Sequence, residues 1–220
     1  MIQMILGILV TNVAYTQLLN IPRIGNEVMT ETRYVEYQGS PYLYSTWKPS
    51  NIFDKEGKEY RDVQVKYDSY KDHFEVNQDG KILVLSKTLY PRIEFNFRDE
   101  EEDKSVRRQF GTGFFVDGKN TEDYFEIIHS GTYKFLKKIK TELVEETVSS
   151  YGTSSHVKRF VTTTHYYLID GTNSGKEFKL NKKSLLEAAG DKRTSFEEVI
   201  QKSGIKIKKE TDVVLLLMNF

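Results

Sequence analysis

Apolar and polar residues alternate along most of the chain from about residue 30 to residue 180, the pattern of β-strands that bury one face. In Arg61–Tyr67, for example, Val63, Val65 and Tyr67 share one face, and polar residues occupy the other. The same alternation recurs in the runs 92–98, 110–116, 124–128, 131–148 and 157–169. Because β-branched and aromatic residues are frequent in these runs, they predict about eight or nine strands in a mainly β fold.

The segments between the runs are short and rich in Gly and Asp, which favours tight turns. They include Asp54–Gly57, Asp79-Gly80, Asp117-Gly118, Ser130-Gly131 and Asp170-Gly171. Strands joined by such turns pair with their neighbours in sequence, whereas parallel strands need crossovers of about a dozen residues or more. Residues 17–180 are therefore expected to form an antiparallel meander. The meander could be a curved sheet, a half-barrel or a closed barrel, and alternation alone does not separate the three.

Beyond residue 180 the spacing of the apolar residues becomes helical. Asn181 is a candidate N-cap for a helix that ends at Gly190. Thr194 and Glu197 form a capping-box pattern for a second helix, which ends at Gly204.

A third helix is expected over residues 212–218, with Thr211 as its cap. This segment is apolar on almost all sides, a property that requires burial. We therefore expect residues 181–220 to form a C-terminal helical subdomain packed on the sheet, which makes the fold α+β with β structure predominant.

Residues 1–16 carry no charged side chain, and the apolar run at 1–10 is followed by the small residues Ala14 and Thr16. This order is typical of a secretory signal peptide cleaved near Gln17. The run is shorter than the roughly 20 apolar residues that span a bilayer, so no stable membrane span is expected. We predict that residues 1–16 are a signal peptide and that the protein is periplasmic or secreted. The alternative is a buried strand or helix of the folded domain.

The chain of 220 residues has 32 basic and 32 acidic side chains and no Cys. The balanced charge argues against a nucleic-acid partner, because a non-specific nucleic-acid binder carries a basic excess. The lack of Cys excludes disulfides, thiolate metal sites and a cysteine nucleophile. A hydrophobic content of 38% with 29% charged residues is that of an ordinary folded domain.

Three short motifs resemble ligand sites but lack a required feature. Residues 171–176 are one residue shorter than a phosphate-binding loop, and Glu177 occupies the position of the hydroxyl that binds Mg²⁺. Residues 77–80 lack the acidic residue that completes a calcium loop, and the acidic run 99–103 lacks the spacing of one. We expect these segments to be turns or solvated loops.

The four His do not have the i, i+4 spacing of a helical zinc site, and the serine motifs of hydrolases are missing. Strands could bring distant His together, but for His165 a surface or half-buried sheet position is the default. The sequence therefore predicts no catalytic residue, no metal site and no cofactor. It leaves open a hydrolase with dispersed carboxylates, because their separation is not visible in a sequence.

Aromatic residues make up 13% of the chain. Three of them, Tyr42, Tyr44 and Trp47, lie in the proline-bounded turn 41–49. Exposed rings beside a turn can stack on sugars or bind a partner, so these three are our candidate ligand-binding residues. The alternative is that the segment covers one end of the sheet and its rings fill the core.

Four stretches carry a resemblance to known proteins: Gly39–Leu43 with Trp47, Val65–Tyr70, Tyr124–Ile128 with Gly131, and Asn181–Ser184. In them the chain resembles uncharacterised exported β-rich proteins of Bacteroidetes-type bacteria. The resemblance covers most of residues 17–220 and implies a location in the cell envelope. Its motifs are aromatic and structural, so it transfers no catalytic residue.

Together these observations favour an exported, non-enzymatic binding protein of the cell envelope. Its partner would be an apolar or polymeric ligand or an envelope protein. Carriage of lipid would require an apolar cavity beneath the helical tail. Two other hypotheses are a structural or protein-interaction module that uses the aromatic turn 41–49, and the hydrolase with dispersed carboxylates.

Overall fold

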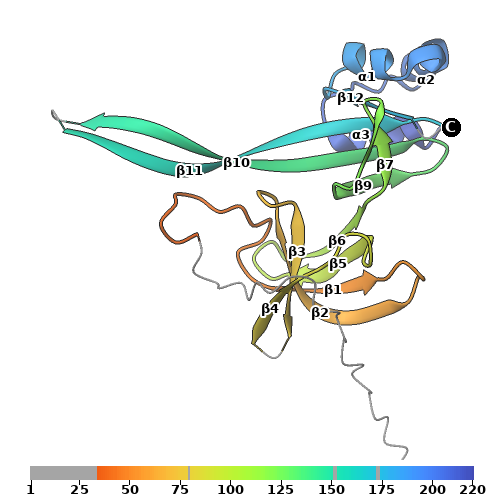
Figure 1. The fold of residues 1–220 in the computed structure, drawn as a ribbon. Helices are drawn as coiled ribbons and strands as arrows, with labels where there is room; N and C mark the ends of the chain where they lie inside the picture. Colours follow the sequence, from red (N-terminus) through yellow and green to blue (C-terminus); the bar gives the residue numbers. More distant parts are fainter. Residues whose placement is uncertain (1–33, 79, 151–152, 172–173) are drawn as a thin grey trace, which may run out of the picture.

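The structure, a computed structural model, describes residues 34–220 apart from 79, 151–152 and 172–173. The predicted signal peptide 1–16 lies outside the described residues. One sheet contains twelve strands (Figure 1). Their bounds are β1 Lys48–Phe53, β2 Glu59–Asp68, β3 His73–Gln78, β4 Lys81–Val84, β5 Arg92–Asp99, β6 Lys104–Gly111, β7 Phe114–Val116, β8 Lys119–Thr121, β9 Phe125–Ser130, β10 Lys134–Ser150, β11 Thr153–Ile169 and β12 Ser174–Phe178.

The strands follow the order β4-β3-β2-β1-β5-β6-β9-β10-β11-β12-β7-β8 across the sheet. Neighbours are antiparallel except for β12 and β7. The sheet has two free ends, β4 and β8, so it is open and not a closed barrel. The mainly β fold and the antiparallel arrangement predicted from the short turns are confirmed.

The β7–β8 hairpin departs from the expected pairing of sequence neighbours. β6 pairs with β9, for example at Gln109 and Ile127, so the hairpin between them in sequence is excluded from that place in the sheet. It lies instead at the far edge, where Phe115 pairs in parallel with Ser174 of β12. The expectation that residues 171–176 form a turn is wrong from Ser174 onward, because β12 begins there.

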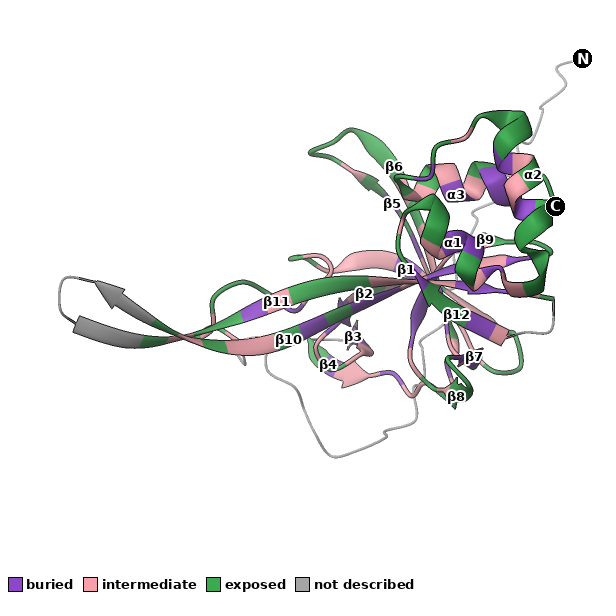
Figure 2. Cartoon of the chain, turned by 90° about the horizontal axis from the view of Figure 1, so that it is seen from above, coloured by how far each residue is buried: buried purple, intermediate pink, exposed green. Residues whose placement is uncertain are grey.

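Two large apolar clusters hold the fold together. Fully buried members of the first, on β2, β3, β5 and β6, are Tyr67, Phe74, Phe95 and Phe110. Fully buried members of the second, between the sheet and the helices, are Phe135, Leu185, Phe196, Val213 and Leu216. Figure 2 shows the helices gathered over one end of the sheet, so the tail packs on the sheet as predicted.

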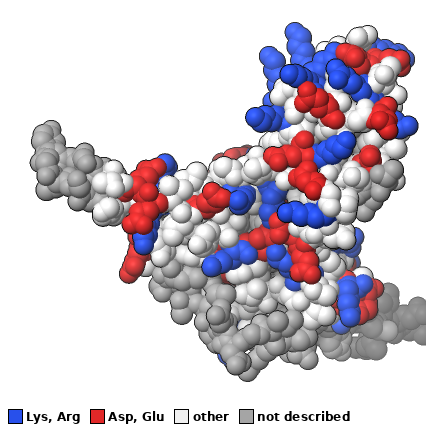
Figure 3. Space-filling model, turned by 45° about the horizontal axis from the view of Figure 1, so that its top comes forward, with Lys and Arg blue, Asp and Glu red and all other residues white. Residues whose placement is uncertain are grey.

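Helices α1 Lys182–Ala188 and α2 Arg193–Ser203 lie close to the predicted ranges. Asn181 caps α1 by accepting a hydrogen bond from the Ser184 amide, as expected, and Gly204 ends α2 with a φ of 69°. A 3₁₀ turn, Gly190–Lys192, leads directly into α2. Thr194 therefore lies inside α2, and the predicted capping box at its start is wrong. Lys and Arg side chains gather around this helical end of the molecule (Figure 3).

Helix α3, Glu210–Leu217, differs from the expectation in its cap and its burial. The Asp212 carboxylate accepts from the amides of Lys208 and Lys209 at 2.9 and 3.0 Å, so Asp212 and not Thr211 closes its N-terminus. One side packs on the sheet, but Leu215 is 54% exposed on the other, so complete burial was a wrong expectation. Within the described residues, no helix is both long enough and apolar enough to cross a bilayer.

Strands β10 and β11 form a hairpin in which 17 residues of each strand pair with the other. β9 pairs only with Lys134–Lys137 of β10, and β12 pairs only with Tyr166–Ile169 of β11. Figures 1 and 2 show the rest of the hairpin extending away from the sheet. We call its residues 142–161 the arm.

Candidate functional site

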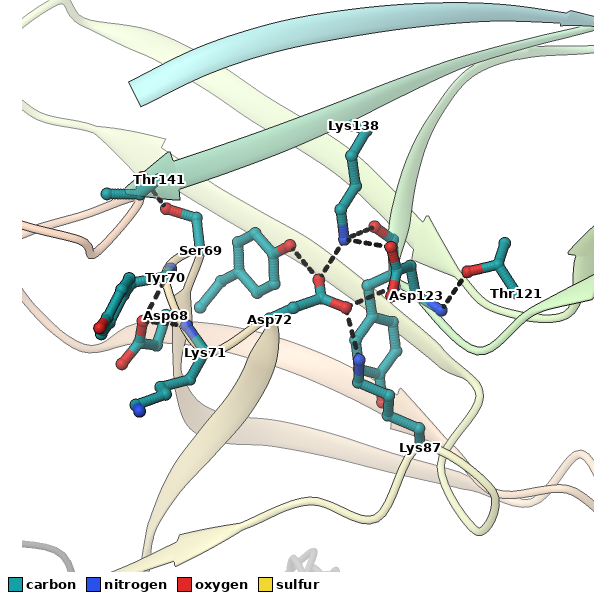
Figure 4. A network of polar contacts seen from close by, with 12 residues as sticks. Asp68, Ser69, Tyr70, Lys71, Asp72, Lys87, Thr121, Asp123, Lys138 and Thr141 are labelled. Atoms are coloured by element: carbon teal, nitrogen blue, oxygen red, sulfur yellow. Dashed lines mark hydrogen bonds and ion pairs between the residues drawn. The ribbon is translucent and has the colours of Figure 1, made fainter. Parts of the chain in front are cut away.

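The turn between β2 and β3 contacts β10. The part of the sheet that contains β2 and β3 therefore meets the part that contains β10. The Thr141 amide donates to the Ser69 carbonyl at 3.2 Å, and the two hydroxyls of these residues lie 2.6 Å apart (Figure 4). The Ser69 hydroxyl also hydrogen-bonds the Pro41 carbonyl at 2.6 Å. This contact brings β2, β10 and the segment 34–47 to one place, which we call the junction.

Asp72, in the same turn, is the centre of a charged network at the junction (Figure 4). Its carboxylate accepts from the Lys138 ammonium and the Tyr67 hydroxyl, each at 2.6 Å, and also binds Lys87. Burial opposes ionisation of this carboxyl, but the charge of Lys138 and the hydrogen bonds from Lys138, Lys87 and Tyr67 outweigh burial and lower the pKa of Asp72. Because Asp123 also lies 3.5 Å from Lys138, the network contains two positive and two negative groups. We assign this balanced network a structural role.

The segment 34–47 joins the outer edge of β11 to the junction. The Gln38 amide donates to the Lys158 carbonyl, and the Phe160 amide donates to the Gln38 carbonyl, both at 2.9 Å. The rings of Tyr34 and Tyr37 pack edge-to-face on Phe160, with centroids 5.2 and 5.6 Å away. The segment thus connects β11 with the turn that follows β2.

The three predicted ligand-binding residues are half-buried and contact their own chain: Tyr42, Tyr44 and Trp47. Tyr44 packs edge-to-face on Phe95 and Phe97, with centroids 5.4 and 5.1 Å away. The Lys66 ammonium lies 5.0 Å from the centroid of the Tyr42 ring and 4.9 Å from that of Trp47. The Tyr44 contacts fit the alternative in which this segment covers the core. Ligand binding by these rings stays a prediction.

Beside Tyr42, the β2–β3 hairpin brings together an imidazole and two carboxylates. Asp68 pairs with His73 across the hairpin, and Glu75 shares a face with His73 because side chains alternate along a strand. His73 Nε2 lies 2.8 Å from Glu75 Oε1 and 3.9 Å from Asp68 Oδ2. Both carboxylate residues are 0% exposed. One ligand atom from each of the three residues lies within 4.8 Å of the others, as in sites that bind divalent ions.

Further hydrogen bonds fix both carboxylates. The Tyr34 hydroxyl donates to Asp68 Oδ2 at 2.6 Å, and the Tyr42 hydroxyl donates to Glu75 Oε2 at 3.2 Å. Asp68 Oδ1 accepts from two backbone amides of the following turn, each at 3.0 Å (Figure 4). This cluster was not predicted from the sequence, because its residues do not have the i, i+4 spacing of a helical metal site. The spacing His-x-Glu within a strand was the available signal.

The other sites considered in the sequence are loops or isolated pairs. The acidic run 99–103 forms the turn between β5 and β6, where Asp99 Oδ1 accepts from the amides of Glu101 and Glu102, so the loop prediction is confirmed. His165 hydrogen-bonds Glu177 at 2.8 Å, and both side chains are more than one-third exposed. Such a pair on the sheet surface lacks the enclosure of a catalytic cleft.

A hollow of about 500 Å³ lies over β5, β6 and β9, and its walls are mostly polar. Glu94, Arg107 and Gln109 are among the residues that line it. Beneath the helical tail, by contrast, Leu185 and Phe196 are fully buried in the second apolar cluster. Within the described residues, we therefore find no support for the apolar cavity that lipid carriage needs.

The edge of β10 that faces away from β11 is open along the arm. On this edge, the Thr141 amide donates a hydrogen bond to the Ser69 carbonyl. The backbone groups of every second residue in a strand point to the same edge. The amides of Leu143, Glu145 and Thr147 therefore also face outward. In the described part of the chain, no segment pairs with β10 beyond Thr141 on this side.

This open edge is acidic. Glu142 pairs with Lys140 and Glu146 pairs with Arg159, both at 2.6 Å, and these side chains are well exposed. Glu145 is exposed and forms no ion pair with a described residue. Figure 3 shows a band of acidic side chains across the arm next to its grey tip.

No family model, no curated protein and no solved structure matches this chain. The resemblance to exported β-rich proteins of Bacteroidetes-type bacteria therefore stays a prediction.

Proposed function

We propose that the protein acts without catalysis, by binding a partner protein along the open edge of β10 in the arm. The observation that carries this proposal is the extension of β10 beyond Thr141, the last of its residues whose outer edge contacts another described segment. An unpaired strand edge is a template for an added strand. A two-stranded ribbon is only marginally stable in water, so an added strand would also stabilise the arm.

The partner we propose is an extended protein segment with Lys or Arg at alternate positions. Such a segment would place basic side chains opposite Glu142, Glu145 or Glu146. A second copy of β10 would instead place acidic side chains opposite one another, an arrangement that destabilises strand pairing. The charge of the edge therefore favours a basic partner over self-association.

The variant Glu145→Pro tests the proposed edge. Because the Glu145 amide points away from β11, Pro at this position removes an outward donor and leaves the hydrogen bonds of the hairpin intact. The matched control Glu145→Thr removes the same charge but keeps the amide. We expect E145P to abolish binding to hexapeptides with alternating Lys, and E145T to weaken it by about tenfold or less.

Binding to a peptide panel of graded charge is measured by fluorescence anisotropy, and the fold of each variant is checked by circular dichroism. Preference for acidic or neutral peptides would contradict the proposed partner. Unchanged binding by folded E145P would contradict the proposed edge. Equal, complete loss in both variants would mean that charge alone, and not strand addition, determines binding.

We further propose that the partner is met outside the cytoplasm, in the periplasm or the medium. The support for this location is the uncharged apolar run followed by small residues at 1–16. N-terminal sequencing of the exported protein is expected to show cleavage near Gln17. Recovery of the protein only from the cytoplasm, with an uncleaved N-terminus, would contradict export.

A further inference from the structure

We propose that Asp68, His73 and Glu75 bind one divalent transition-metal ion, with Zn²⁺ as the first ion to test. This metal site is independent of the partner-binding edge, because its residues lie on the β2–β3 hairpin and not on the arm. The donor set of one imidazole and two carboxylates suits Zn²⁺ and also Mn²⁺.

The spacing of the ligand atoms supports the site. A tetrahedral ion with bonds of about 2.0–2.1 Å has ligands about 3.3 Å apart. His73 Nε2 is 2.8 Å from Glu75 Oε1 and 3.9 Å from Asp68 Oδ2, so the observed separations lie on either side of that value. Changes of about half an ångström would bring these two separations to the tetrahedral value. All three ligand atoms already lie within 4.8 Å of one another.

Burial and charge give the second argument. Asp68 is 0% exposed, and in the described chain its ion pairing is with His73 and not with a Lys or Arg. Burying a carboxylate is costly unless positive charge compensates it. A divalent ion bound at this position would place positive charge directly on the Asp68 carboxylate.

The hydrogen bonds around the carboxylates give the third argument. Metal-binding carboxylates are held in position by further hydrogen bonds, which orient them toward the ion. The Tyr34 hydroxyl holds Asp68, and the Tyr42 hydroxyl holds Glu75. The side chain of His73 is 13% exposed, which gives an ion a path from solvent to the otherwise buried ligands.

Isothermal titration of the full chain, freed of metal with a chelator, tests the proposal with ZnCl₂ and, in parallel, MnCl₂. We expect one ion per chain for at least one of the two metals. His73→Gln is expected to weaken binding at least about tenfold. The matched control is His165→Gln, because His165 also forms a His–carboxylate pair, with Glu177 at 2.8 Å. This control is expected to leave the affinity within about twofold.

X-ray absorption of the metal-loaded wild-type chain tests the site even if H73Q does not fold. The expected spectrum has one imidazole nitrogen and otherwise oxygen ligands. The proposal is overturned by the absence of binding for both ions, by unchanged affinity in folded H73Q, or by loss of binding in H165Q. A spectrum without imidazole, or with two imidazoles, would also overturn it.

Discussion

Asp72 connects two lysines that lie far apart in sequence, Lys87 after β4 and Lys138 in β10. The pKa of Asp72 is lowered in the folded chain, so the native state binds fewer protons at this group than the unfolded state does. The ionised carboxylate therefore stabilises the fold above the unfolded pKa of about 4. This stabilisation is lost as the pH falls below that value and through the folded pKa.

We predict that Asp72→Asn lowers the free energy of unfolding by about 3 kcal/mol at pH 7, because it leaves two half-buried or buried lysines without their shared carboxylate. Urea unfolding at pH 7 and again at pH 3 measures the effect. The difference between the wild type and D72N should shrink at pH 3, because this pH lies below the unfolded pKa of Asp72 and proton uptake by the unfolded wild type reduces the stabilisation that the ionised carboxylate gives. An equal difference at both pH values would show that Asp72 does not stabilise the fold through its charge.

At the residue scale, the sequence predicts which face of a strand a side chain occupies better than it predicts which residues that side chain contacts. That His73 and Glu75 share a face follows from the period of two in a strand, and a turn of four residues places Asp68 opposite His73. The hydrogen bonds from Tyr34 and Tyr42 depend on how the segment 34–47 crosses the hairpin. No local pattern encodes that crossing, so the candidate metal site could be predicted only in part.

Helix α3 packs one side on the sheet and leaves the other in water, so neighbouring leucines in it differ sharply. Leu216 is 0% exposed in the second apolar cluster, whereas Leu215 is 54% exposed. We predict that Leu216→Ala lowers the free energy of unfolding by about 2–5 kcal/mol, because it removes buried apolar volume and leaves a cavity. Leu215→Ala is the matched control, with an expected change of about 0.5 kcal/mol or less.

Chemical denaturation of the two variants gives both values under one set of conditions. A similar loss in L215A and L216A would mean that the exposed side of α3 is covered in solution. At the scale of elements, the helices were predictable from the spacing of their apolar residues. Asn181 caps the start of α1 and Gly204 ends α2, as expected. The α3 cap was not, since Asp212 turns back to amides that precede the helix.

The described residues form a packed body and an arm, and among the described residues of the arm only Phe160 belongs to the buried hydrophobic set. None of the three buried apolar clusters has a member between residues 144 and 159. We predict that replacing residues 146–157 with Asn-Gly, a favoured two-residue hairpin turn, changes the free energy of unfolding by about 1 kcal/mol or less. The pair Glu146–Arg159 is lost, but exposed ion pairs contribute little.

Thermal and urea unfolding measure the stability of this shortened chain, and the peptide-binding assay measures its function. Wild-type stability together with lost binding is the expected result. A large loss of stability would show that the arm is part of the folding unit, and retained binding would place the partner site elsewhere. The variant joins Glu145 to Lys158, which are already paired across the hairpin.

The architecture at this scale was predictable where it follows from local turns. Antiparallel neighbours such as β3 and β4 or β5 and β6 are joined by short turns that the sequence predicted, whereas the turn between β2 and β3 was not predicted. The position of β7–β8 was not predictable, because it depends on β9 reaching β6 first. The length of the arm was not predictable either. The alternation of apolar and polar residues in β10 continues unchanged past Lys137, where its pairing with β9 ends.

The place of β7 also constrains the order in which the chain can assemble. Its partner β12 is synthesised far later, and Gly175 must fit closely there, because a Cβ at that position would lie 2.7 Å from Val116 Cγ1. A nascent chain that has reached β9 contains β8, which pairs with Phe114 and Val116 on one edge of β7. The other edge of β7 has no strand partner until β12 emerges from the ribosome. This edge of the sheet therefore forms late, and a chain stopped before residue 174 would leave one edge of β7 without its neighbouring strand.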